Sequence, residues 1–109
     1  MIFDVIISAQ AEEDLRGIFE YITFELLSPE NAEKQLERLE KQILSLDEMP
    51  ERFPRYAKEP WYSRGLRFVA IDNYIVFYIP DMEEQMVTIL RVMYSGRNIE
   101  EQLSDYTKQ

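Results

Sequence analysis

The feature of this sequence that most constrains its fold is a pair of amphipathic helical patterns separated by only a few residues. The first pattern begins at Gln10. The second begins at Ser28-Pro29-Glu30, which offers an N-cap oxygen, a proline at the first helical position and an early acid. In both patterns apolar residues recur at spacings of three and four: Ala11, Leu15, Ile18, Phe19, Ile22 and Leu26, then Ala32, Leu36, Leu39, Ile43 and Leu46. Because the loop between them is short, the helices are predicted to form an antiparallel hairpin with its apolar stripes toward a common core.

Strand-like segments before and after the hairpin can cover those stripes. One lies at residues 2–8, and three more follow a proline-rich link, at 66–71, 74–79 and 86–93. The last three segments are separated by Asp72-Asn73, a two-residue hairpin signal, and by a longer polar turn. Short links of this kind predict an antiparallel meander.

These elements predict an α+β fold with a single domain spanning residues 1–109. The N-terminal strand is expected to join the meander in a four-stranded antiparallel sheet, with the helical hairpin packed on one face. Residues 99–106 are predicted to form a short closing helix. Six helical residues are expected in the core: Leu15, Phe19, Ile22, Leu36, Leu39 and Ile43.

Composition narrows the chemistry that the chain can perform. It has no cysteine and no histidine, so it lacks the thiolate ligand, the commonest metal ligand and the usual general base. We therefore expect no metal and no cofactor, and any reaction must use Tyr, Arg, Lys or carboxylates. No stretch of the sequence is apolar enough to span a membrane and none resembles a signal peptide, so a cytoplasmic location without a membrane partner is expected.

The net charge of −9 argues against a nucleic-acid partner, but the charge is unevenly distributed. Residues 1–50 hold 12 acidic and 4 basic side chains, whereas residues 51–70 hold 5 basic and 2 acidic ones. An acidic helical half and a basic strand-side half could present different faces to different partners. Ordinary solvated surface charge is the alternative interpretation.

The last predicted strand carries the candidate site. Arg91 lies inside an apolar run, and Tyr94 and Arg97 follow at its end beside Ser95-Gly96, a pair that breaks strands. Two guanidiniums and a phenol so close together predict an anion-binding site. The alternatives are structural: Arg91 pairing with a glutamate, Tyr94 packing as an aromatic plug, and Arg97 capping the strand-to-helix junction.

Five short motifs, in this order, resemble the RelE/ParE superfamily of bacterial toxins across nearly the whole chain. They are A-x-x-D-L-x-x-I-x-x-Y-I from Ala11, S-P-x-x-A from Ser28, L-x-x-x-P from Leu46, N-Y-x-x-F-Y from Asn73 and R-V-x-x-x-x-R from Arg91. The long hairpin with S-P-x-x-A is more similar to the ParE-like branch, the plasmid stabilisation proteins, than to compact RelE. The resemblance implies the toxin of a type II toxin–antitoxin pair, bound by a cognate antitoxin as a dimer or a heterotetramer.

The superfamily divides in function. ParE-like members poison DNA gyrase, whereas RelE-like members cleave mRNA on the ribosome without a metal. On the RelE pattern Arg67 and Arg91 would bind the scissile phosphate, Arg97 would stabilise the transition state and Tyr94 would transfer a proton. The sequence departs from that pattern at Ile75, where RelE enzymes have an arginine. Their lysine pair has no clear counterpart either, since Leu66 and Phe68 occupy the nearest positions.

Three hypotheses follow from the resemblance. The favoured one is a growth-inhibiting toxin that binds a gyrase-type target, because the catalytic set is thin. The second is a ribosome-dependent mRNA endonuclease, and the third is a degenerate, non-toxic homologue that still binds antitoxin. Antitoxin binding is expected on an open sheet face and a groove beside the hairpin, which leave apolar residues such as Val76 and Tyr78 uncovered. The strand that begins at Tyr74 is expected to lie between Arg67 and Arg91 and to hold them on one concave surface with Tyr94 and Arg97.

Overall fold

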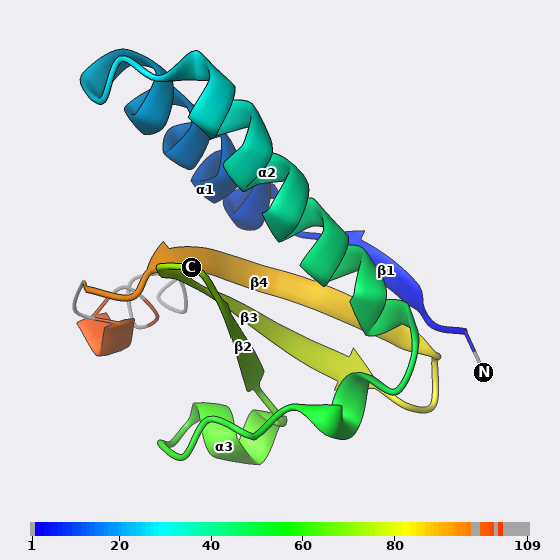
Figure 1. Cartoon of the computed structure of the whole chain (residues 1–109). Coiled ribbons are helices and arrows are strands. Elements are labelled where there is room, and N and C mark those ends of the chain that lie inside the picture. Colours follow the sequence, from blue (N-terminus) through cyan, green and yellow to red (C-terminus); the bar gives the residue numbers. More distant parts are fainter. Residues whose placement is uncertain (1, 97–98, 102, 104–109) are drawn as a thin grey trace.

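The chain is described by a computed structural model that covers residues 2–96, 99–101 and 103 (Figure 1). The main elements are β1 (Asp4–Ile7), α1 (Ala9–Glu20), α2 (Pro29–Leu44), α3 (Trp61–Arg64), β2 (Arg67–Ile71), β3 (Tyr74–Asp81) and β4 (Met86–Tyr94). A π-helical turn (Tyr21–Glu25) extends α1, and two short 3-10 turns (Ser45–Asp47 and Pro50–Arg52) follow α2. Residues 99–101 and 103 are helical, and the rest of the predicted closing helix lies outside the described residues.

The predicted α+β architecture is confirmed, with one correction to the sheet. The strand order is β1-β4-β3-β2, so the strand that begins at Tyr74 does lie between those of Arg67 and Arg91. The pairs β2/β3 and β3/β4 are antiparallel, but β1 runs parallel to β4, with Val5 opposite Val87. The sheet is therefore mixed, and the prediction of a purely antiparallel sheet was wrong.

Local sequence explains how the hairpin begins and turns. Ser8 caps α1, because its hydroxyl accepts a hydrogen bond from the Ala11 amide at 3.1 Å. Pro29 occupies the first turn of α2, as its fixed φ angle favours. Between the helices Leu27 adopts a left-handed backbone conformation with φ of 52°. In Figure 1 the hairpin crosses one face of the sheet and its turn extends past the sheet's edge.

Two apolar clusters hold the layers together, one on each face of the sheet. The cluster under the hairpin joins Ala11, Leu39 and Ile43 to the strand residues Val69, Val76, Tyr78, Val87, Ile89 and Val92. The cluster on the other face joins Trp61, Leu66, Phe77, Leu90, Met93 and Leu103. Both faces of the sheet are thus covered, the second by the segment around α3 and by Leu103 of the C-terminal helix.

The structure corrects two of the burial predictions. Val76 and Tyr78 are fully buried, not exposed on an open face, since they point toward the hairpin. Of the six predicted core residues, Ile22, Leu39 and Ile43 are buried. Leu15, Phe19 and Leu36 are only partly buried, because they line a groove between α1 and α2. No helix in the described part of the chain is long and apolar enough to cross a membrane.

Candidate functional site

Arg91 lies in β4 and forms a buried ion pair with Asp14 of α1. Its Nε donates to Asp14 Oδ2 at 2.7 Å and its Nη2 donates to Oδ1 at 2.9 Å, which is the bidentate geometry of a strong arginine–carboxylate pair. The residue is 9% exposed. The sequence had left two roles open for Arg91, and these contacts fit the structural one, although the partner is an aspartate instead of a glutamate.

The backbone explains why a carboxylate is needed at this place. The pairing of β1 with β4 ends at Ile7 and Ile89, after which Ser8 turns the chain into α1. Beyond that point Asp14 Oδ2 accepts a hydrogen bond from the backbone amide of Val92 at 2.9 Å. One carboxylate of α1 thus binds both the edge of β4 and the guanidinium beside it.

Arg67 has a different set of partners. Its Nη1 donates to the carbonyl oxygens of Phe53 at 2.6 Å and Glu51 at 3.2 Å, and its Nη2 lies 3.7 Å from the Glu51 carboxylate. Next to it, Tyr78 donates its hydroxyl hydrogen to the Pro50 carbonyl at 2.6 Å. Burial raises the pKa of Tyr78 to about 12, against a smaller lowering by the Arg67 and Arg52 charges. Arg67 and Tyr78 therefore fasten residues 50–53 to the sheet.

Tyr94 is the most exposed of the predicted site residues in the described chain, at 48%. Its ring meets that of Tyr74 edge to face, with centroids 5.9 Å apart. The pKa of Tyr74 is raised, first by burial and then by the neighbouring Tyr94 and Tyr21 phenols. Gly96 permits this arrangement, because a Cβ there would lie 2.5 Å from the Tyr94 ring. Tyr94 thus belongs to a tyrosine cluster where the end of the sheet approaches the hairpin.

The three described candidates have different partners within the chain. Arg67 pairs with Tyr78 and Arg91 pairs with Phe77, and the register of β3 with β4 is irregular between these two positions. Arg67 binds residues 51 and 53, whereas Arg91 binds Asp14 of α1. Tyr94 pairs with Tyr74, which lies four positions along β3 from Tyr78. Each arginine is directed to its own intrachain partner. Arg97 lies outside the described residues.

The sequence interpretation missed Asp14, although a signal for it existed. It entered the sequence interpretation only as the aspartate of the motif that begins at Ala11. Its spacing from Ala11, Leu15 and Ile18 places it on the apolar stripe, where an acid needs a buried partner. An acid on that stripe and an arginine inside a strand together indicate an ion pair between helix and sheet.

The basic segment at residues 51–70 is also largely engaged within the chain. Arg52 donates to the carbonyls of Ser45, Glu48 and Met49, in the segment that follows α2. The Arg55 guanidinium lies 4.0 Å from the centre of the Tyr62 ring and donates to the Tyr62 carbonyl. Such contacts order this segment and leave fewer cations available to a phosphate backbone.

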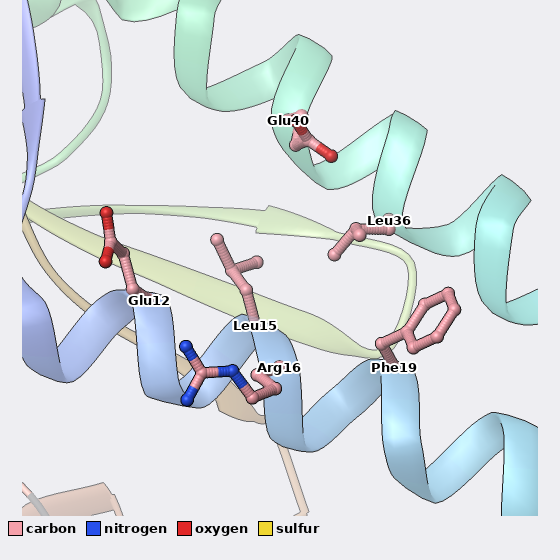
Figure 2. A pocket seen from close by; sticks show the side chains of 6 residues that line it. All are labelled: Glu12, Leu15, Arg16, Phe19, Leu36 and Glu40. Carbon is pink, nitrogen blue, oxygen red and sulfur yellow. The ribbon is translucent and has the colours of Figure 1, made fainter.

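A groove between the two long helices is the other concave feature. Figure 2 shows Leu15 and Phe19 of α1 facing Leu36 of α2, with Glu12, Arg16 and Glu40 at its rim. Its floor is apolar and its rim is mostly acidic. Across residues 2–96, 99–101 and 103, no cluster of three or more acidic side chains could hold a metal ion.

This fold, with a helical hairpin over a sheet in which the first strand pairs with the last, is the RelE-like fold. Residues 5–99 match the family described as the ParE toxin of the type II toxin–antitoxin system parDE. The chain therefore belongs to the ParE toxin family and is the toxin component of a type II toxin–antitoxin system.

Three solved structures share this fold. The ParDE system of P. aeruginosa is 19% identical with a TM-score of 0.70, covering 85% of this chain and 96% of that one. The RelBE2 complex of Mycobacterium tuberculosis is 20% identical with a TM-score of 0.65, and the match covers 86% of this chain and 92% of that one. A mutant of E. coli RelE in the free state is 16% identical with a TM-score of 0.65, and the match covers 99% of this chain and 97% of that one. No curated protein sequence matches the chain significantly.

Proposed function

We propose that this toxin inhibits growth by binding a gyrase-type target and not by cutting RNA, and that a cognate antitoxin neutralises it. The observation that carries the proposal is the engagement of Arg67 and Arg91 with intrachain partners. A metal-free nuclease needs cations directed at the position where negative charge develops on the phosphate. Arg91 bound in a bidentate manner to Asp14 is poorly placed for that role.

Two further points support a binding mechanism. The family match is to ParE toxins, and the ParDE system of P. aeruginosa is among the structures with the same fold. Neither histidine nor cysteine is present to act as a base, and an unperturbed phenol has a pKa of about 10. Among the three predicted site residues that the structure describes, Tyr94 is the most exposed, and the catalytic roles assigned to all four stay predictions.

The antitoxin is proposed as the first partner of this chain. The similar P. aeruginosa structure is of a toxin–antitoxin system, and the M. tuberculosis structure is of a toxin–antitoxin complex. We expect the product of an adjacent gene to form a stable complex with this chain when the two are co-expressed. Two purified proteins that fail to associate would contradict this part of the proposal.

Controlled expression in bacteria without antitoxin separates the mechanisms. We expect growth arrest with DNA breaks covalently linked to gyrase, and no new mRNA ends when transcripts are mapped by primer extension. Cleavage of mRNA at ribosome-dependent positions would overturn the proposal in favour of the RelE-like hypothesis. Continued growth at high expression would favour the degenerate homologue.

A matched pair of variants tests the part played by Tyr94. Tyr94→Ala should reduce toxicity, because it removes the most exposed of the described site side chains, and its structural cost is limited to the ring contact with Tyr74. Tyr62→Ala is the control, since Tyr62 is an exposed tyrosine in α3, away from this cluster. Equal toxicity of Tyr94→Ala and the unchanged protein would remove Tyr94 from the site.

A further inference from the structure

The turn of the helical hairpin, residues 21–27, exposes an unusual number of large apolar side chains. We name this surface the hairpin tip. Tyr21, Phe24, Leu26 and Leu27 are each between 54% and 81% exposed, four large hydrophobic residues within seven positions. In Figure 1 the tip projects beyond the sheet, away from α3 and the turn between β3 and β4. Single exposed apolar residues are ordinary, but a local group of this kind marks a contact surface.

The backbone at the tip is unfavourable for the residue that it exposes most. Leu27 adopts a left-handed conformation with φ of 52°, which glycine and asparagine tolerate better than leucine does. Its side chain is 81% exposed and so gains almost no burial within the chain. A leucine that is costly for the backbone and contributes little to the core points to a role outside the core.

The charge around the hairpin tip limits what can cover it. From Gly17 to Glu33 the chain carries four glutamates and no lysine or arginine. Nucleic acid and an anionic membrane surface would be repelled by such a tip. A second copy bound tip to tip would place the same glutamates against each other, since a two-fold interface brings identical patches together.

We propose that the hairpin tip is a docking surface for a protein segment in which apolar side chains are flanked by lysine or arginine. Phe24, Leu26 and Leu27 provide the apolar contact, and Glu20, Glu25 and Glu30 attract the flanking cations. Charge complementarity of this kind selects partners and speeds their association. The proposal does not depend on gyrase being the target, because it concerns the chemistry of the partner segment alone.

Peptide display on the full-length chain tests this directly. A library of random peptides is selected on the unchanged protein, and the affinity of each enriched peptide is measured by fluorescence anisotropy. We expect enriched peptides to combine leucine, phenylalanine or similar residues with lysine and arginine. We expect Phe24→Ser/Leu27→Ser to weaken their binding about tenfold or more, as loss of a central anchor does.

Three further variants make the result specific. Leu27→Asn suits the left-handed backbone, so it should keep or raise the melting temperature of the chain. It should nevertheless weaken binding of the enriched peptides, which separates an effect on binding from an effect on folding. Glu20→Gln/Glu25→Gln should weaken peptide binding more at low salt than at high salt. Leu44→Ser/Met49→Ser changes two exposed apolar residues away from the tip and should leave binding unchanged.

Several outcomes would overturn the proposal. These are a failure to enrich any peptide, enriched peptides that lack basic residues, and unchanged affinity for Phe24→Ser/Leu27→Ser. Sedimentation of the chain with phosphatidylglycerol vesicles that is lost in the Phe24→Ser/Leu27→Ser variant would also overturn it, since the tip would then be a membrane contact.

Discussion

Asp14→Ala should be among the most destabilising single substitutions in this chain. The change leaves the Arg91 guanidinium, in a residue that is 9% exposed, without its carboxylate, and removes the acceptor of the Val92 amide. Breaking a buried ion pair by removing one partner typically costs about 3–5 kcal/mol. Domains of this size have a total unfolding free energy of roughly 5–15 kcal/mol, so the substitution should remove a large part of it.

The physical origin of this cost can be separated with a double-mutant cycle. Arg91→Met alone leaves Asp14 as the uncompensated charge, and it should also destabilise the fold strongly. Asp14→Ala/Arg91→Met removes both charges, so it should be more stable than the sum of the single changes predicts. Asp14→Asn keeps an acceptor for the Val92 amide and should therefore lose less than Asp14→Ala.

Urea unfolding followed by circular dichroism measures these differences. Arg38→Ala is the control, because it breaks the ion pair between Arg38 and Asp72, which is exposed and 2.8 Å long, and should have a much smaller effect. An unfolding free energy of Asp14→Ala equal to that of the unchanged protein would refute the argument. Strict additivity in the cycle would show that Asp14 and Arg91 do not interact.

Three other substitutions test the core, the phenol of Tyr78 and the turn after β4. Leu39→Ala should lose about 2–5 kcal/mol of stability in the same urea assay, because Leu39 is fully buried, and an unchanged midpoint would contradict its placement. The pKa of Tyr78 is raised to about 12 in the folded protein. The stability that its neutral phenol gives the fold is therefore fully present below about pH 10, the ordinary tyrosine pKa, and is lost as pH rises through about 12. Tyr78→Phe should flatten the fall in melting temperature over that pH range, and an identical fall would refute the assignment. Gly96→Ala should displace the Tyr94 ring and change the near-ultraviolet circular dichroism with little loss of stability, whereas an unchanged spectrum would count against the contact.

Much of the fold could be predicted from sequence because periodicity and short turns are local signals. The apolar stripes around Ala11 and Leu39 identified both helices, and Asp72-Asn73 fixed the antiparallel pairing of β2 with β3. The direction of β1 had no such signal, since the whole hairpin and two strands separate it from β4. Its parallel pairing is set by the path of the chain through the tertiary structure.

The candidate site was harder to predict because its partners are distant in sequence. A charged residue inside a strand showed that Arg91 needs a partner, but Asp14 lies 77 positions away. Arg67 was predicted to bind phosphate, and no local pattern indicated its hydrogen bonds to Phe53 and Glu51. The alternation of side chains along a strand also could not predict that Val76 and Tyr78 are buried, because the hairpin and residues 50–53 bury them.

The central claim, that this toxin acts by binding its target, is tested most directly with purified gyrase. DNA supercoiling and covalent gyrase–DNA complexes are measured while the toxin is titrated from below to above the gyrase concentration. The account predicts inhibition that saturates near equimolar toxin, together with trapped complexes, and reversal when the cognate antitoxin is added. Unaffected gyrase, with mRNA cut on purified ribosomes by substoichiometric toxin, would contradict it.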